Sequence, residues 1–448
     1  MTLSADDARA LARRTLEMSG ADETEVLVFA EDKTLTRFAN NHIHQNVAEE
    51  NVSVSIRAVR GRQIGVASTN RTDEASMRAC AASALQAASA APEDRAFPGL
   101  PEPVSEPIAT PERAYECTRG FDAEARARAV GAIVEQSSER GLVAAGTVSR
   151  AEHVTAVANS KGIDVGMATT SLTASVLSMG NDGGSGWGSF TAADAGLFAP
   201  EALGDEAATL AERSANPTDF EPGTYSVVLA PEAVADILQF LGYVGFSAKA
   251  VEEGTSFMSG NMEAGIGSEL VTIVDDALAS HALGITFDYE GCPKQPTTLL
   301  EYGVAKRPVT DSYWASKTGW SNSGHALPAP NPHGPMPWNL EMAPGTATID
   351  ELIASVKRGV YVTRFHYVNV EDPVPVLLTG MTRDGTFLIE DGHLTRPLKN
   401  LRFTQSATEA LWWTSGVTRE RSFFGGDEGA VLAPGILVDR FNFTGQTT

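Results

Sequence analysis

The sequence predicts an α+β protein with two domains. Residues 1–218 are expected to form an N-terminal α/β domain with a mixed sheet and helices, and residues 219–448 a C-terminal, mainly antiparallel β domain. Helix signals and strand-like runs alternate through the first half, whereas short strand-like runs and glycine turns dominate the second half. Between the halves, residues 216–223 (NPTDFEPG) have the composition of a linker. A chain of 448 residues is long enough to build two cores.

The first half opens with a predicted amphipathic helix. Ser4 and Asp7 have the spacing of a capping box at its start. Strand-like runs follow, and residues 52–59 alternate apolar and polar side chains, as a strand with one buried face does. Asp73 is then placed to cap an alanine-rich helix that extends to about residue 91. Helices flanking a β-meander indicate an α+β layer.

Two features organise the second half. Pro231 is placed to begin a helix, because the following apolar residues recur with helical spacing at Val234, Ile237, Leu238 and Leu241. Residues 328–344 are rich in proline and too long for a simple connection, so they are predicted to form a lid or a partner-binding segment.

The stretch 251–278 lies between these features. It begins with closely spaced glycines, which indicate a loop, and continues into the apolar run 270–274, which is predicted to be a buried strand. The strand is expected to stop at Asp275 and Asp276. Adjacent strand residues point to opposite faces, so these two carboxyl groups are interpreted as turn formers and not as a catalytic pair.

The composition excludes several kinds of partner. A net charge of −23 argues against nucleic acid and against an anionic membrane surface as ligands. The three cysteines are far apart and form no CxxC pair, which favours reduced thiols in a cytoplasmic protein. No apolar run reaches the ~18 residues of a membrane span, and no apolar signal segment is apparent at the N-terminus.

The stretch 251–278 also carries a resemblance to a known family. Residues 254–260 (GTSFMSG) and 270–276 (LVTIVDD) resemble the GTSxFSG loop and LVTVVDD strand of the TldD/PmbA (TldD/TldE) peptidase-related proteins. The resemblance implies an N-terminal α/β domain, a mainly antiparallel β domain, and a dimer that encloses a chamber. The family contains zinc-bearing subunits and metal-free partners, which assemble into a heterodimeric peptidase.

The chain departs from the family pattern at the zinc site. Zinc-bearing members have an HExxxH helix before the loop; counting back without a gap, Gln239 and Phe240 stand where His-Glu is expected, and Val244 where the second His is expected. Such members take a third ligand from a C-terminal Cys, and the corresponding tail 423–430 (FFGGDEGA) has none. A zinc peptidase needs these ligands and a glutamate base. The resemblance therefore implies a TldE/PmbA-like chain without its own metal or catalytic residue, with zinc in a TldD-like partner.

The remaining role is peptide binding. Ser256, Met258 and Ser259 on the loop, with Arg364 and His366 on a later strand, are predicted to line the chamber and hold an extended peptide by strand addition. The alternative is that the loop glycines only satisfy backbone geometry and that Arg364 pairs with a buried carboxylate.

Three functional hypotheses follow. The first is the metal-free subunit of a heterodimeric zinc peptidase, and the second is a stand-alone peptide-binding or scaffold protein without catalysis. The third is a hydrolase with another nucleophile, for which Cys292 is the best candidate. The histidines offer little support for a metal site: His42 and His44 share one face of a possible strand but are interpreted as surface residues. Four others are expected in loops without ligand spacing: His281, His325, His333 and His393.

Overall fold

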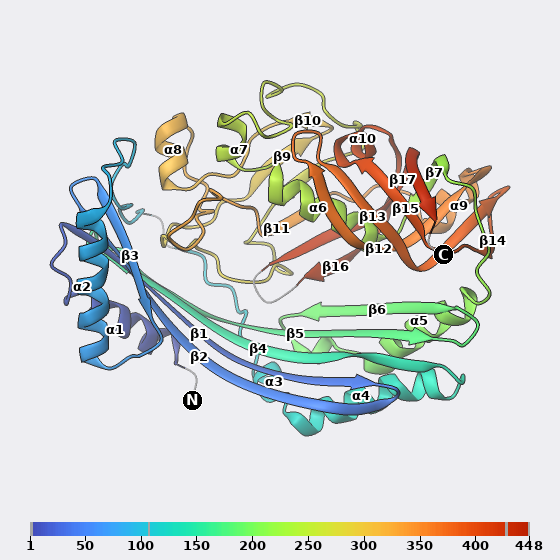
Figure 1. Ribbon diagram of the computed structural model, residues 1–448, viewed down its shortest axis with the longest axis horizontal. Helices are drawn as coiled ribbons and strands as arrows, with labels where there is room; N and C mark the ends of the chain where they lie inside the picture. The colour runs from blue at the N-terminus through green and yellow to red at the C-terminus, as the bar shows by residue number, and fades with distance from the viewer. Residues whose placement is uncertain (1–2, 106–107, 426–428, 447–448) are drawn as a thin grey trace.

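The computed structural model describes residues 3–105, 108–425 and 429–446. The described chain contains two β-sheets, one from each half of the sequence (Figure 1). The sheet of the first half is long and curved, and the second half lies over part of its inner face (Figure 1). The predicted α+β class is therefore confirmed. Among the described helices, none has both the length and the apolar composition needed to cross a bilayer.

The first sheet has six strands in the order β3-β2-β1-β4-β5-β6. All of its strand pairs are antiparallel, so the mixed sheet expected from the sequence was wrong in this detail. Neighbouring strands that follow one another in the chain are joined by tight turns, which produce antiparallel pairs without crossovers. The strands are β1 (Glu23–Ala39), β2 (His42–Arg60), β3 (Gln63–Thr69), β4 (Val143–Asn159), β5 (Asp164–Met179) and β6 (Ser185–Ala192).

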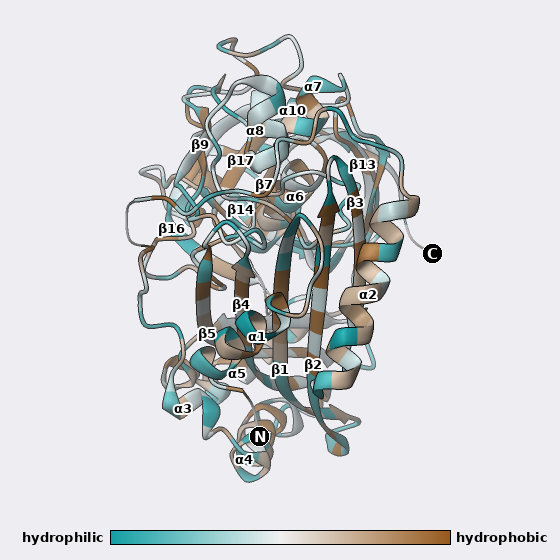
Figure 2. Cartoon of the chain, turned by 90° about the vertical axis from the view of Figure 1, so that its left-hand side faces the viewer, coloured by the Kyte–Doolittle hydropathy of each residue, from teal (hydrophilic) through white to brown (hydrophobic). Residues whose placement is uncertain are grey.

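Helices cover the outer face of this sheet. The predicted capping box is present at the first helix. The Ser4 hydroxyl accepts the N–H of Asp7, and the Asp7 carboxylate accepts the backbone N–H of Ser4. The first two helices pack on the end of the sheet visible in Figure 2, with a core that includes Leu11, Val28 and Met77. The helices of this half are α1 (Ala5–Leu16), α2 (Glu74–Ala90), α3 (Glu116–Arg119), α4 (Ala123–Ser138), α5 (Pro200–Arg213) and the short 3-10 helix η1 (Ala195–Leu197).

The second sheet has 11 strands and is mainly antiparallel, as predicted. Two of its pairs, β7 with β12 and β11 with β17, are parallel. Its strands are β7 (Gly223–Leu229), β8 (Ile273–Asp275), β9 (Thr297–Glu301), β10 (Val304–Ala305), β11 (Asn339–Met342), β12 (Arg358–Asp372), β13 (Leu377–Glu390), β14 (His393–Pro397), β15 (Leu401–Ser406), β16 (Thr414–Gly425) and β17 (Ala430–Gln446).

The helix predicted to begin at Pro231 is present and buries its predicted apolar face. Val234, Ile237, Leu238 and Leu241 all belong to the main core of the second half. The helices of this half are α6 (Pro231–Val244), α7 (Ala248–Glu252), α8 (Ser312–Thr318), α9 (Ile349–Ser355) and α10 (Ala407–Trp412).

The strand predicted over residues 270–274 is shorter and begins later. The N–H of Val271 donates to the carbonyl of Ser268 at 2.9 Å, which closes a turn, and Leu270 is 45% exposed. Within this run, the residues that pair with the neighbouring strands β9 and β11 are those of β8. The apolar run predicted a longer strand because sequence alone does not show where partner strands end.

The two halves share a core where residues 277–294 cross to the first sheet. Ile285 and Phe287 pack with Leu27 and Val157 of that sheet. The guanidinium of Arg113 also crosses the boundary, and it donates to the carbonyl oxygens of Ala277 at 2.6 Å and Gly284 at 3.0 Å. The division at residue 218 stays a prediction, with extensive packing across it.

Candidate functional site

A large cavity lies between the first sheet and α6. Its volume is about 950 Å³, a size typical of ligand sites. Its walls come from four parts of the chain: strands β1 and β4, helix α6, the proline-rich segment 328–344 with the preceding Leu327, and the facing ends of β16 and β17. The segment predicted to be a lid thus contributes Met336, Pro337 and Trp338 to the wall of the cavity.

Helix α6 lines the cavity with the side opposite its buried face. Gln239, Phe240 and Tyr243 face the cavity, because residues three and four apart share one side of a helix. Their functional groups are an amide, a phenyl ring and a phenol. Most of the remaining lining is apolar, which suits the burial of an uncharged side chain.

The wall formed by the first sheet carries one ionisable pair. Glu31 of β1 and His153 of β4 are directly opposite in the strand register, and the His153 Nε2 to Glu31 Oε1 distance is 3.1 Å. The ring of Phe29 lies 5.5 Å from the imidazole, measured between ring centroids. The carboxylate and the phenyl ring together fix the orientation of the imidazole.

A second, smaller cavity of about 440 Å³ adjoins the first. The two share Gln239, Phe424, Gly425 and Val431 in their walls. One side is α6, which contributes Glu232 and Asp236, and the opposite side is the first sheet, with five hydroxyl-bearing residues: Thr147, Thr173, Ser175, Ser189 and Thr191. The smaller cavity is thus polar and acidic where the larger one is apolar.

Burial changes the acidity of the two carboxyl groups on α6. It raises the pKa of Glu232 to about 7, against the opposing effects of Arg364 and of the Trp187 indole N–H, which donates to Glu232 at 2.8 Å. Burial likewise raises the pKa of Asp236 to about 7, with Arg364 again opposing the shift. Both groups therefore titrate near neutral pH.

Arg364 lies beside this cavity but is already paired. Its Nε donates to Asp384 Oδ2 at 2.9 Å, and a second guanidinium nitrogen contacts the same oxygen. The guanidinium stacks on the ring of Trp187, with Cζ 4.1 Å from the centroid. This geometry matches the alternative raised from the sequence, in which Arg364 pairs with a buried carboxylate.

His366 lies two residues further along β12 and contacts the ring of Tyr367, with centroids 4.8 Å apart. Burial, together with the positive charges of Arg383 and Arg364, lowers the pKa of His366. Neither of the two cavities described above includes His366 in its wall. A peptide contact by His366 stays a prediction.

The loop residues predicted to hold a peptide face inward. Ser256 donates its hydroxyl to the carbonyl of Gly245 at 2.6 Å and accepts the N–H of Met258 at 2.9 Å. The Met258 side chain is fully buried in the core, and the Ser259 hydroxyl donates to the carbonyl of Val251 at 2.9 Å. These contacts hold the loop in shape, and the peptide-contact role of the three residues stays a prediction.

The side chains available in the main cavity do not fit a catalytic zinc ion. Zinc peptidase sites use three protein ligands, mostly imidazole and carboxylate. Gln239 and Phe240 offer neither, and Val244 packs against the core of the second half. In the described lining, Glu31 and His153 are bonded to each other, and no third ligand of these types joins them. Residues 426–428 of the tail considered for a ligand lie outside the described chain, and their sequence is Gly-Asp-Glu.

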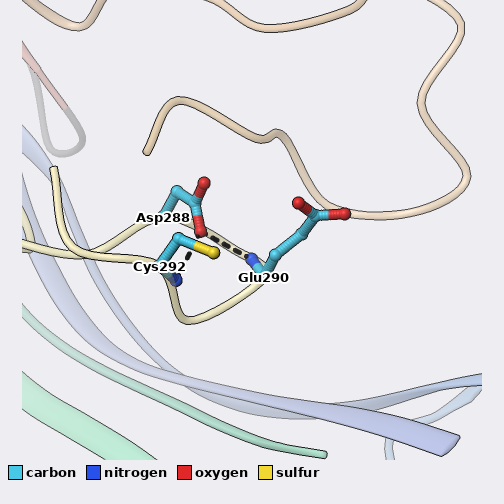
Figure 3. Close-up of side chains that lie close together, drawn as sticks. All are labelled: Asp288, Glu290 and Cys292. Atoms are coloured by element: carbon cyan, nitrogen blue, oxygen red, sulfur yellow. Dashed lines mark hydrogen bonds between the residues drawn. The ribbon is translucent and has the colours of Figure 1, made fainter. Parts of the chain in front are cut away.

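A second group of possible ligands, Asp288, Glu290 and Cys292, lies in a buried turn (Figure 3). Asp288 Oδ1 accepts the N–H groups of Glu290 and Cys292, at 3.0 and 2.9 Å, and Oδ2 accepts that of Ala326 at 3.0 Å. Gly291 has φ +78°, and a Cβ there would lie 2.5 Å from a side-chain carbon of Ile163. The turn is therefore built around the carboxylate of Asp288.

The side chains of Glu290 and Cys292 in this turn are also constrained by their neighbours. Glu290 Oε1 accepts from Arg57 at 3.1 Å, and the same guanidinium bridges to Glu25. Burial and neighbouring carboxylates raise the pKa of Cys292, which keeps it a thiol and a poor nucleophile. This arrangement counts against the hypothesis of a Cys292 nucleophile.

One buried pair was missed by the sequence analysis. His325 Nε2 lies 2.8 Å from Asp275 Oδ1, and Asp275 Oδ2 accepts the N–H of Asn339 at 2.7 Å. Burial acts to raise the pKa of Asp275, but His325, Lys294 and the N–H of Asn339 together outweigh it and the pKa is lowered. The interpretation of Asp275 as a turn former was wrong, because Asp275 ends β8 and pairs with His325, while His325 lies in a loop, as predicted.

Comparisons with known proteins agree with this architecture. The chain matches the PmbA/TldA metallopeptidase C-terminal domain over residues 222–445, domain 1 over residues 24–88 and the central domain over residues 100–215. The crystal structure of TldE from Thermococcus kodakarensis has the same fold, with a TM-score of 0.85 and 19% identity, covering 97% of this chain and 99% of that one.

Curated relatives match over shorter stretches. A metalloprotease TldD homolog from Haemophilus influenzae is 30% identical over 199 residues, which are 42% of this chain and 41% of the relative. A metalloprotease from Methanothermobacter thermautotrophicus is 28% identical over 219 residues, covering 48% of this chain and 46% of the relative. The chain thus spans less than half the length of these relatives.

Two facing sheets with a large cavity at their junction define the chain as an α+β protein with the fold of the TldE structure. Since one domain match covers half of the chain and two others cover most of the rest, the chain belongs to the PmbA/TldD metallopeptidase family.

Proposed function

We propose that this chain is the metal-free, TldE/PmbA-like subunit of a heterodimeric zinc peptidase that processes or degrades peptides. In this role it shapes the chamber and holds the peptide, while a TldD-like subunit carries zinc and cleaves. The observation that supports the proposal best is the α6 wall of the main cavity, where Gln239, Phe240 and Tyr243 supply no customary zinc ligand. A large cavity whose described wall offers no set of zinc ligands suits peptide binding better than peptide hydrolysis.

The role assigned to the cavity follows from its chemistry. Its apolar lining favours peptide side chains, and the adjoining hydroxyl groups can bond a peptide backbone. Glu31 is hydrogen bonded to His153 and would serve to orient that ring, rather than to deprotonate a metal-bound water. The cytoplasm is the proposed location, because the three cysteines are free, as expected in a reducing compartment.

The test separates the chain from its proposed partner. Zinc content and peptidase activity are measured for the purified chain, for a TldD-like homologue from the same source, and for the mixture. We expect no stoichiometric zinc and no cleavage for this chain alone, and cleavage for the mixture above that of the partner alone. A matched control replaces the partner's HExxxH glutamate and should abolish the activity. Stoichiometric zinc together with peptidase activity in the isolated chain would refute the proposal.

A stand-alone peptide-binding or scaffold protein is the second candidate. Peptide binding by the isolated chain, with no complex and no added activity in the mixture, would support this candidate over the first.

A further inference from the structure

The face of α6 that looks into the two cavities changes chemistry along its length. Glu232 and Asp236 lie one turn apart in the smaller cavity, Gln239 lies in both, and Phe240 and Tyr243 lie in the larger one. At 1.5 Å per residue, the distance along the axis from the first to the last of these residues is about 16 Å. An extended peptide of about five residues covers the same length.

The acidic end of this cleft lacks a cation of its own. The described residues that line the two cavities include three carboxylates (Glu31, Glu232 and Asp236) and neither lysine nor arginine. The nearby guanidinium of Arg364 is bound to Asp384 and stacked on Trp187, so its charge is largely committed. Two carboxyl groups at i, i+4 spacing, facing a cavity, suit a positively charged side chain between them.

The opposite wall supplies groups for a peptide backbone. Five hydroxyl-bearing residues line the same cavity from three neighbouring strands: Thr147, Thr173, Ser175, Ser189 and Thr191. Within this wall the hydroxyls of Thr147 and Ser175 bond each other, and that of Thr191 donates to the carbonyl of Gly425. Hydroxyl groups both donate and accept, so they suit the N–H and C=O groups of an extended chain without fixing its sequence. Selection among peptide side chains would then come from the two ends of the cleft, of which one is acidic and the other apolar.

We propose that this cleft selects extended peptides in which a lysine or arginine side chain lies between Glu232 and Asp236 and an apolar side chain, about three residues away, fills the cavity at Phe240 and Tyr243. The inference rests on the proposed peptide-binding function and specifies its substrate class. A bound ammonium or guanidinium group stabilises both carboxylates in their charged form, which burial alone disfavours.

The ionisation of the two groups gives the binding a pH dependence. Arg364 from β12 acts on both groups, and Glu206 from α5 acts on Glu232. Asp384 from β13 is bound to Arg364. Because the pKa values of Glu232 and Asp236 are raised to about 7, more of the free cleft is charged at pH 8 than at pH 6. Binding of a cationic peptide therefore strengthens as the pH rises over this interval.

The experiment measures binding of short peptides to the full-length chain by fluorescence anisotropy. Labelled seven-residue peptides of alanine and serine carry one lysine and one phenylalanine three positions apart, in both orders; in matched peptides the lysine is replaced by glutamine or glutamate. We expect the lysine peptide of the favoured order to bind about tenfold more tightly than its glutamine counterpart, and the glutamate peptide to bind most weakly.

Two double variants identify the residues responsible. Glu232→Gln with Asp236→Asn should reduce the preference for lysine over glutamine to about twofold or less. Urea denaturation, with a cooperative transition at least as stable as that of the natural chain, shows that the fold of this variant is intact. The control is Glu135→Gln with Glu139→Gln, a pair with the same spacing at the exposed surface around the end of α4, and it should keep the full preference.

The outcomes are distinct. If the three peptides bind equally well, or if the α6 double variant keeps the preference for lysine, the inference is overturned while the peptide-binding function stands. If none of the peptides binds to the folded chain, the proposed function itself fails, and the inference fails with it.

Discussion

Two acidic regions of the molecule use their carboxyl groups differently. The turn at residues 288–292 brings two carboxylates and a thiol within reach of one another, as a metal site would. Each carboxylate there is already bonded, Asp288 to three backbone N–H groups and Glu290 to Arg57. On α6, Glu232 and Asp236 face an open cavity. The difference teaches that carboxyl groups lining a cavity mark a binding site better than a high density of ligand atoms does.

The largest effect should come from a substitution at the turn 288–292 and its ion pairs, called the closed region here because its carboxylates are already bonded; the α6 carboxyl groups at the cavity are the open region. Arg57→Met removes the cation that holds Glu25 and Glu290, whose side chains are 5% and 8% exposed, and leaves two buried carboxylates without their counter-charge. We expect the free energy of unfolding to fall by about 3–5 kcal/mol, measured by urea denaturation. The control Arg71→Met, at a side chain 76% exposed, should change it by less than about 0.5 kcal/mol. A loss below about 1 kcal/mol for Arg57→Met would show that the ion pairs do not hold this region together.

In the open region, the effect of Glu232 and Asp236 on the free energy of unfolding should depend on pH. In the folded chain the pKa values of Glu232 and Asp236 are raised to about 7. Between about pH 4 and pH 7 the folded chain therefore keeps protons on these two groups that the unfolded chain has released. The contribution of the two groups to stability falls as the pH rises through this window. Glu232→Gln with Asp236→Asn removes that contribution. Relative to the natural chain, the variant should gain about 1–2 kcal/mol of stability between pH 5 and pH 8, allowing for water in the cavity. Parallel stability curves for the two proteins would contradict the raised pKa values.

A smaller effect is expected from the indole that borders the open region. Trp187→Phe keeps a ring beneath Arg364 but removes the N–H donated to Glu232 at 2.8 Å. The expected cost is about 1 kcal/mol at pH 8, and less at pH 5, where Glu232 is protonated. Chemical denaturation at the two pH values measures the difference. An equal cost at both would mean that packing of the indole, and not its hydrogen bond, stabilises the wall.

The smallest effect should come from Cys292 in the closed region. Cys292→Ala deletes a buried thiol and should cost no more than about 1 kcal/mol of stability. If the third hypothesis is wrong, the peptidase activity of the complex with the partner subunit should stay unchanged in this variant. Loss of that activity, in a variant that remains folded, would revive Cys292 as a nucleophile.

Local signals in the sequence predicted much of the fold. The capping box at Ser4 and the apolar face of α6 are set by successive residues at most four positions apart, and both were confirmed. The two carboxyl groups at i, i+4 on the polar face of α6 were also visible as a local signal, but they were not used. The sequence pattern did not predict the short length of β8, since the extent of its partner strands is a property of distant segments.

The candidate site was harder to predict because its pairs join distant residues. Glu31 meets His153 through the register of β1 and β4, and Arg57 meets Glu290 across the boundary between the halves of the chain. The pairing of Asp275 with His325 is of the same kind. Hydrophobic periodicity fixes the face of a strand but not the partner that a side chain meets on that face.

The position of β17 in the second sheet bears on synthesis of the chain. This final strand pairs with β7, β11, β15 and β16, so it holds together segments made early and late. Since domains fold as units while the ribosome adds residues from the N-terminus, the second sheet cannot close until the last strand has left the exit tunnel. Until then β7 and β11 have open edges, and a nascent chain at this stage is a natural client for chaperones.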